Sequence, residues 1–373
     1  MRGTKFLSFL IISLILTAFL AGYIMVNRGL GSGSKSKTGT ILDKFGEQQL
    51  TDSKEQVPEG NGIFPISSVK VVSVSNSSDR KGTIYFEKNT GKLFEFDFSS
   101  NQEQVISDTV LPNFLSSIWS PVKKEALNLF YSPGNTKITY HNYDTGKTND
   151  LNNNIRSVAF SPDGNMIAYY LTNTIDSDES YPPTNEMAPV TSQINKLYIS
   201  QPDGTYPKKI LDTRITDLEI SWPIKDQLSF ITPDREVFLL TESGRLTKFL
   251  EPRTNLTTKW SVGGKKLLFS WGEDITNQQL WLKDTESKSE KNLTLSIIAS
   301  RCAWSIDNIN IFCAVAKTPS IDDIYRINTN TGSQELLVEP AMPLEDIFLT
   351  AVEDYLIFKN AADEKLYGVK LLP

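Results

Sequence analysis

The strongest constraint on the fold is a turn that recurs along the chain at a nearly constant spacing. Its clearest copy is Phe-Ser-Pro-Asp-Gly at residues 160–164. Pro162 presets the backbone φ angle, and Asp163 and Gly164 are residue types that tight turns require. The apolar segment 166–171, which follows, has the composition of a β-strand. This stretch therefore predicts a strand, a turn and a second strand.

Two markers repeat along the chain with the same period. The first is an aromatic residue just before the turn, at Trp119, Phe160, Trp222, Trp260, Trp304 and Phe348. The second is an aliphatic residue in a later strand, at Leu93, Ile138, Leu197, Val237, Leu280, Ile324 and Leu366. Both recur roughly every 40–45 residues, apart from one longer interval in the third unit. Turn residues and a short further strand follow the second marker in several units, which gives four strands per unit.

Units of four strands at this period are typical of the blades of a β-propeller. An ordinary β-sandwich does not require such a period. The sequence therefore predicts an all-β fold, a seven-bladed β-propeller over residues 63–373. A six-bladed propeller is the alternative, if the first or the last unit is not a true blade.

The last unit contains only three predicted strands before Pro373. A blade with a missing strand would leave a sheet edge exposed. We expect residues 63–66, Ile-Phe-Pro-Ile, to supply the missing strand from the other end of the domain. Pro65 is compatible with this role because proline is tolerated on an outer edge strand.

The motif at residues 160–164 resembles the repeat signature of TolB-like and WD-repeat-like β-propellers. It is also similar to the propeller domains that precede the hydrolase domain in prolyl oligopeptidases. Partial copies are Trp-Ser-Pro at 119–121 and Trp-Ser at 260–261. The resemblance covers roughly residues 68–373 and implies a fold more than an activity. The chain lacks the Gly-His and Trp-Asp dipeptides of true WD repeats, which argues against that family proper.

The amino-terminal region predicts a membrane tether. Residues 6–26 carry no charge, and a membrane-spanning helix needs about 20 apolar residues. We predict a short cytoplasmic tail at 1–5, a transmembrane signal anchor at 6–26 and a flexible linker at 27–62. A cleaved signal peptide is the alternative, although the run is long for one and the obvious cut after Ala21 would place Phe19 at the −3 position. Basic residues flank the span almost equally, so the favoured orientation, with the propeller outside, rests on the usual export of domains behind such anchors.

Composition gives few candidates for catalysis. His141 is the only histidine, so a Ser-His-Asp triad or a histidine-rich zinc site would depend on it alone. No Gly-x-Ser-x-Gly motif occurs, and we interpret His141 as structural. The prediction is that the chain is not an enzyme and needs no cofactor or metal. A formal net charge of −6 does not suggest a nucleic-acid partner.

The two cysteines, Cys302 and Cys313, flank the predicted turn of the sixth unit. In a hairpin centred on Asp307 and Asn308 they would face each other across two strands. A disulfide in an oxidising compartment and a pair of buried free thiols are both compatible with this arrangement.

The long interval in the third unit corresponds to an insertion over about residues 173–193. It contains a possible partner-binding loop with three acidic residues and a Tyr-Pro-Pro run: Asp176, Asp178, Glu179, Tyr181, Pro182 and Pro183. Asp-x-Asp could bind calcium, but the glycine and the closing Glu of an EF-hand loop are missing. A solvated loop without a partner is the alternative.

These features favour a membrane-anchored, extracytoplasmic propeller acting as a non-catalytic platform for a protein or cell-envelope partner. Its predicted location is the cell membrane, with a single span. The alternatives are a propeller enzyme that acts on carbohydrate or peptide with carboxylates at its central channel, and a sensor domain for a small ligand.

Overall fold

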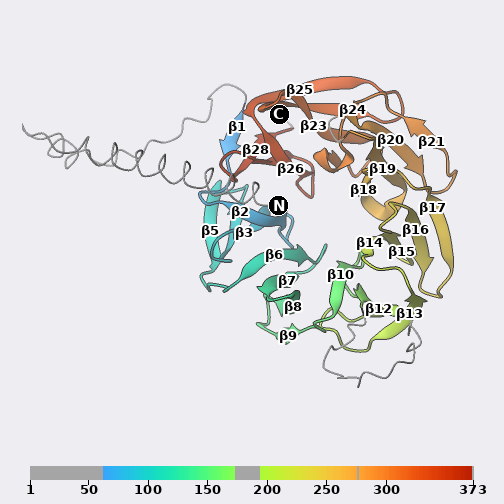
Figure 1. Ribbon diagram of the computed structural model, residues 1–373. Coiled ribbons are helices and arrows are strands. Elements are labelled where there is room, and N and C mark those ends of the chain that lie inside the picture. The colour runs from blue at the N-terminus through green and yellow to red at the C-terminus, as the bar shows by residue number, and fades with distance from the viewer. Residues whose placement is uncertain (1–61, 173–193, 275–276, 372–373) are drawn as a thin grey trace, which may run out of the picture. The chain divides into compact units, whose positions relative to one another are not determined.

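The computed structural model describes residues 62–172, 194–274 and 277–371. The chain divides into two units, Met1–Gln56 and Val57–Pro373. The second unit forms a ring of seven four-stranded antiparallel sheets, which we number as blades 1 to 7 (Figure 1). The predicted seven-bladed propeller is confirmed, and the six-bladed alternative is wrong.

The strands follow one another from the innermost to the outermost position in each of the first six blades. Blade 1 contains β2 (Val71–Asn76), β3 (Gly82–Glu87), β4 (Leu93–Asp97) and β5 (Gln102–Ser107). Blade 2 contains β6 (Phe114–Trp119), β7 (Glu125–Ser132), β8 (Asn135–Asn142) and β9 (Thr148–Asp150). Blade 3 contains β10 (Ile155–Phe160), β11 (Ile167–Leu171), β12 (Asn195–Ser200) and β13 (Lys208–Thr213).

The later blades repeat this plan. Blade 4 contains β14 (Glu219–Ile224), β15 (Gln227–Ile231), β16 (Val237–Thr241) and β17 (Leu246–Leu250). Blade 5 contains β18 (Thr257–Trp260), the 3-10 turn η1 (Val262–Gly264), β19 (Lys266–Trp271), β20 (Gln279–Asp284) and β21 (Glu290–Asn292). The 3-10 turn η3 (Ala299–Arg301) leads into blade 6, with β22 (Cys302–Trp304), β23 (Asn310–Thr318), β24 (Ile321–Asn328) and β25 (Gln334–Met342).

Blade 7 closes the ring with strands from both ends of the domain. It contains β26 (Leu344–Leu349), β27 (Tyr355–Asn360), β28 (Leu366–Lys370) and β1 (Ile63–Pro65). In the antiparallel pairing, Phe64 of β1 lies opposite Gly368 of β28. The predicted closure by residues 63–66 is confirmed, with Pro65 on the outermost strand.

A hydroxyl group organises the first turn of several blades. The residue after the first strand is Ser161 in blade 3, and its Oγ accepts a hydrogen bond from the backbone N–H of Met166 at 3.0 Å. The same contact, between residues five apart, recurs from Ser77 in blade 1, Ser261 in blade 5 and Thr350 in blade 7. A short polar side chain at this position satisfies a backbone donor that the turn leaves unpaired.

Apolar side chains from neighbouring blades form the core. Trp304 at the end of β22 is buried against Leu268 and Leu280 of blade 5, and its Nε1 donates a hydrogen bond to the Lys259 carbonyl at 3.1 Å. Phe160 takes the equivalent place between blades 2 and 3. The row of aromatic residues predicted from the sequence therefore joins blades together.

One member of that row was misplaced by a residue. Leu349 pairs with Leu356 in blade 7 as Trp304 pairs with Ile311 in blade 6, so Leu349, and not Phe348, is the equivalent of Trp304. The Thr350 hydroxyl marks the start of the turn, and Phe348 lies one position too early to be the equivalent of Trp304.

None of the described residues belongs to a helix long and apolar enough to cross a membrane. The predicted tail, anchor and linker at residues 1–5, 6–26 and 27–62 lie outside the described residues, except for Gly62.

Candidate functional site: the first-turn face

In each blade the turn between the first and second strands lies on the same side of the ring, which we call the first-turn face. The turns of three consecutive blades carry exposed aliphatic side chains, Val262 in blade 5, Ile306 in blade 6 and Val352 in blade 7. These side chains are 54%, 59% and 57% exposed. We call these three residues the aliphatic patch. Exposed apolar side chains gathered at one place often mark an interaction surface.

A pocket of about 250 Å³ lies beside the aliphatic patch and is lined by residues of blades 1, 5, 6 and 7. Val262 and Ile306 are part of its wall. Its other walls combine aromatic, aliphatic and polar groups, chiefly Asn76, Lys259, Trp260, Trp304 and Phe348. The pocket is therefore mostly apolar, with one basic residue, Lys259, and one acidic residue, Glu353.

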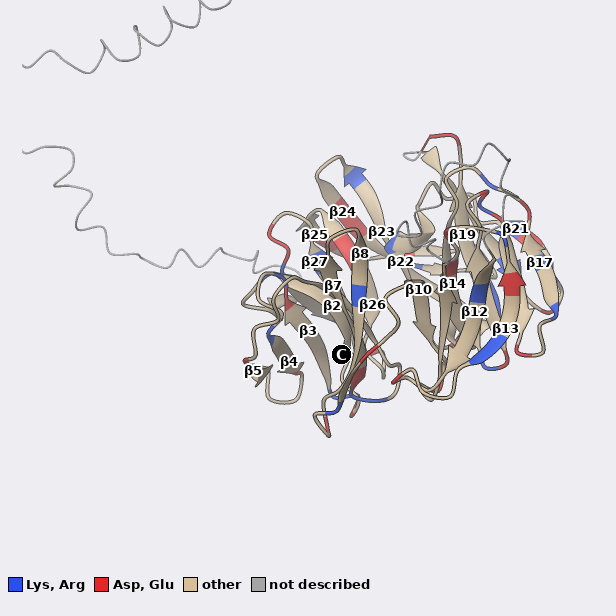
Figure 2. Cartoon of the chain, turned by 60° about the horizontal axis from the view of Figure 1, so that its bottom comes forward, with Lys and Arg blue, Asp and Glu red and all other residues tan. Residues whose placement is uncertain are grey.

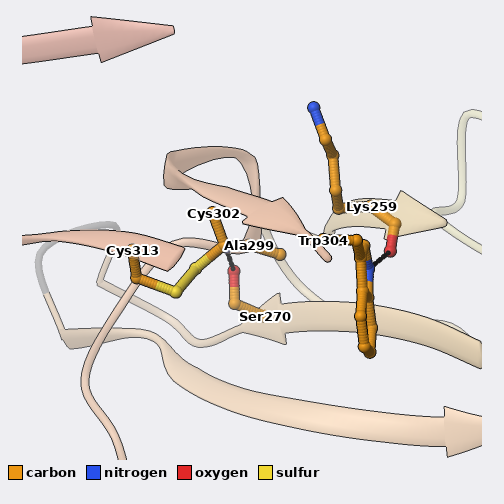
Figure 3. The surroundings of a disulfide bond; sticks show 6 residues. All are labelled: Lys259, Ser270, Ala299, Cys302, Trp304 and Cys313. Atoms are coloured by element: carbon orange, nitrogen blue, oxygen red, sulfur yellow. Dashed lines mark hydrogen bonds between the residues drawn. A yellow bond between two sulfur atoms is a disulfide. The ribbon is translucent and has the colours of Figure 1, made fainter. Parts of the chain in front are cut away.

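Lys259 is placed in this wall by the alternation of β18. Its neighbour Trp260 packs with the apolar side chains between blades 4 and 5, so the Lys259 side chain leaves the opposite side of the strand. Figure 3 shows the Lys259 ammonium pointing away from the Trp304 ring, although the Lys259 carbonyl accepts the indole hydrogen bond.

Desolvation by the surrounding protein lowers the pKa of Lys259, and the negative charge of Asp346 partly opposes this shift. The side chain nevertheless remains accessible to water. Both observations fit a group that is enclosed by walls yet open at one end. Among the described residues, no ion pair or side-chain hydrogen bond involves the Lys259 ammonium.

Glu353 holds the pocket's rim in place. Its carboxylate accepts hydrogen bonds from the Ser305 hydroxyl at 2.9 Å and from the Ile306 backbone N–H at 2.6 Å. These contacts tie the first turn of blade 6 to that of blade 7. Because both carboxylate oxygens are engaged, Glu353 is a poor partner for a ligand cation.

The disulfide lies in blade 6, which also contributes residues to the pocket wall. Cys302 and Cys313 are directly opposite each other on β22 and β23, with Cα atoms 4.1 Å apart, and a disulfide bond joins them (Figure 3). Both residues are fully buried. Nearby, the Ser270 Oγ accepts a hydrogen bond from the Ala299 backbone N–H at 3.0 Å. Of the two alternatives that the sequence left open, the structure contains the bonded form.

His141 lies elsewhere, in the wall of a cleft of about 490 Å³ formed by blade 2 and the segment 111–113 that leads into it. Its ring stacks on that of Tyr143 with the centroids 4.0 Å apart. Burial lowers the pKa of His141 and raises that of Tyr143 to about 12. A stacked, neutral imidazole on β8 agrees with a packing role.

The predicted partner-binding loop cannot be placed beside either pocket. Its residues, Asp176, Asp178, Glu179, Tyr181, Pro182 and Pro183, lie outside the described residues. Within the described ranges, no group of three or more His, Cys, Asp or Glu side chains is arranged to hold a metal ion.

Sequence reasoning missed Lys259 and the aliphatic patch. The sequence could have indicated Lys259, because the side chain of a lysine next to a buried aromatic residue in a strand points to the opposite face of the sheet. The sequence could also have indicated the members of the aliphatic patch, since turn positions usually hold polar residues. Nothing in the sequence indicated that the three patch residues share one face, because blades 5 to 7 come together only in the ring.

No family model and no curated protein matches the chain in sequence. Solved structures do resemble it. An oligogalacturonate lyase in complex with manganese is similar with a TM-score of 0.62 and 12% identity, over 83% of this chain and 93% of that one. The Cps50 (Swd1) β-propeller domain of Myceliophteria thermophila has a TM-score of 0.56 and 11% identity, over 83% and 98%. The acylaminoacyl peptidase of Pyrococcus horikoshii has a TM-score of 0.54 and 11% identity, over 78% of this chain and 49% of that one.

The likeness to the lyase overturns one prediction. The single histidine and the absence of a Gly-x-Ser-x-Gly motif predict that the chain is not an enzyme. That prediction is wrong, because a propeller of the same architecture serves as a lyase. At 12% identity the likeness extends to the fold alone.

The resemblance to WD-repeat-like propellers and to the propeller domains of peptidases is confirmed as a likeness of fold. The architecture, the closure by β1 and these neighbours agree with one another. The chain is a seven-bladed β-propeller that shares its fold with propeller domains of enzymes and of other proteins.

Proposed function

We propose that the chain is a membrane-tethered β-propeller that presents its first-turn face to a protein partner. The observation that carries this proposal is the aliphatic patch, three exposed apolar side chains on consecutive blades beside a pocket. Isolated apolar side chains are common on protein surfaces, whereas a group on one face favours an interface.

Two further features support the tether and the compartment. The uncharged run at residues 6–26 is long enough to span a bilayer, with residues 1–5 on the cytoplasmic side and residues 27–62 as the linker. A buried disulfide is typical of proteins that fold in an oxidising compartment. The proposed place of the propeller is therefore the extracytoplasmic side of a cell membrane, facing a partner in the envelope.

Site-specific photo-crosslinking tests the docking face. A photoreactive phenylalanine derivative replaces Val262, Ile306 or Val352 in the full chain, and membranes containing the variant are irradiated. The matched controls carry the same group at Val105 on β5 or Leu336 on β25, which are also exposed apolar positions.

We expect a discrete protein adduct of the same mass from the three patch positions and no such adduct from the controls. If all five positions give the same set of adducts, or if the patch positions give none, the first-turn face is not the docking face.

A further inference from the structure

The ammonium of Lys259 has no ion-pair partner among the described residues. Lys359 in the neighbouring part of the ring differs in this respect. Lys359 in blade 7 lies 3.0 Å from carboxylate oxygens of both Glu345 and Asp346. Asp346 influences Lys259 electrostatically, but its carboxylate is engaged by Lys359. The Lys259 ammonium is thus a positive charge without an ion-pair partner among the described residues, and an incoming anion can neutralise it.

The size and lining of the pocket restrict the anion. A volume of about 250 Å³ is below the usual range for drug-sized ligands, so the pocket can enclose the end of a ligand. Phe348 and Ile306 supply apolar surface in the same pocket as Lys259. The bound group must therefore combine an anionic end with an apolar body.

A polypeptide C-terminus meets both requirements within one residue. Its α-carboxylate and its side chain leave the same Cα atom, so one group can reach Lys259 while the other packs on the aromatic wall. The carboxylate of an internal Asp or Glu lies at the end of its own side chain, so an apolar side chain beside it must come from another residue. Capture of a terminal carboxylate is an established mode of peptide recognition.

We propose that the pocket lined by Lys259 and Phe348 binds the C-terminal carboxylate of a partner polypeptide whose last residue is apolar. This inference rests on the proposed function, because it names the part of the partner that docks on the first-turn face. Lys259 supplies the charge, and Ile306 and Phe348 supply contact with the terminal side chain.

The test measures binding of short peptides to the purified full chain by calorimetry. The probe is acetyl-Gly-Gly-Phe with a free carboxylate. It is compared with its C-terminal amide and with acetyl-Gly-Gly-Gly, which keeps the carboxylate but lacks the apolar side chain. We expect the free acid to bind at least tenfold more tightly than either comparison peptide.

Variants assign the effect to the pocket. Lys259→Met should weaken binding of the free acid at least tenfold and leave the amide unchanged, whereas Lys259→Arg should retain most of the affinity. Lys265→Met is the matched control, because Lys265 is an exposed cation in the first turn of the same blade and is not part of the pocket wall. Equal thermal midpoints for the variants show that the fold is retained.

Equal binding of acid and amide, or undiminished binding to Lys259→Met, would overturn the proposal. Binding of inorganic phosphate or of vesicles rich in anionic lipid that depends on Lys259 and exceeds that of the peptide would also overturn it. The two proposals fail separately. Discrete crosslinks from the aliphatic patch without peptide binding would remove only the C-terminal site, and peptide binding without such crosslinks would remove only the docking face.

Discussion

At the scale of single residues, Gly164 shows how the repeated turn also sets the contact between blades. Its φ angle is +65°, and a Cβ atom added there would lie 2.4 Å from the Ser120 Oγ of blade 2. Glycine is therefore required twice, for the left-handed backbone conformation and for the close approach of the neighbouring turn. Asp163 completes this turn by accepting hydrogen bonds from the Ser161 hydroxyl and the Asn165 backbone N–H.

We expect Gly164→Ala to lower the free energy of unfolding by about 2–4 kcal/mol, since it adds backbone strain and a steric clash. Gly134→Ala is the control, because Gly134 has a φ angle of +76° but no atom within 4 Å of an added Cβ. That variant should lose only about 1–2 kcal/mol. Urea unfolding measures both values.

A second substitution isolates the clash. The Ser120 Oγ is buried and has no hydrogen-bond partner among the described residues, so Ser120→Ala removes the clashing atom at little cost. The double variant Gly164→Ala/Ser120→Ala should regain part of the stability lost by Gly164→Ala. Equal losses for Gly164→Ala and Gly134→Ala, or no recovery in the double variant, would show that the contact between blades 2 and 3 is unimportant.

At the scale of elements, β1 decides whether the ring is closed. The Ile66 backbone N–H donates to the Leu366 carbonyl at 2.9 Å, and the Leu366 N–H donates to the Ser67 Oγ at 2.8 Å. Phe64 contacts the rings of Phe96 and Tyr355, with centroids 6.2 Å and 5.7 Å apart. The strand thus fills an interface between blades 7 and 1 as well as covering the edge of β28.

A chain that begins at Val69 should therefore unfold at a lower temperature than one that begins at Val57. Loss of these buried apolar groups is expected to lower the thermal midpoint by roughly 5–10 °C. The uncovered edge of β28 should also promote association, which size-exclusion chromatography detects. Identical midpoints and elution volumes for the two chains would contradict a role for β1 in closure.

At the scale of the whole molecule, the proposed function requires a membrane tether and an exported propeller. Figure 2 shows basic and acidic residues interspersed over the blades, so the location of the protein is better tested through residues 6–26 and the disulfide than through surface charge. About 20 apolar residues suffice to hold a chain in a bilayer.

We expect the full chain to remain with the membranes after an alkaline carbonate wash, and a chain without residues 6–26 to be released. In denatured cell extracts, Cys302 and Cys313 should react with a thiol reagent only after reduction. The control is the full chain with residues 6–26 all replaced by Leu, and it should stay with the membranes. Free thiols in the untreated extract, or a full chain found in the soluble fraction, would refute the proposed location.

Local sequence was enough to predict most of the fold. Each pair of markers, such as Trp304 and Ile324, indicates strands separated by turns. This local order depends on residues close together in the sequence. The facing positions of Cys302 and Cys313 followed from the same register, because residues equidistant from a hairpin turn lie opposite each other. The position of Phe348 was wrong by one because the turn hydroxyl, here Thr350, fixes the register more reliably than the aromatic residue.

The sequence by itself determined the repeat, the number of blades and the strand that closes the ring, since each follows from periodicity and from the need to cover a sheet edge. The tertiary structure alone decided that Lys259, Ile306 and Phe348 meet at one pocket beside the aliphatic patch. These residues belong to three blades, and their distance depends on how the blades pack around the ring. Packing of this kind is a property of the closed ring as a whole, which no single repeat specifies.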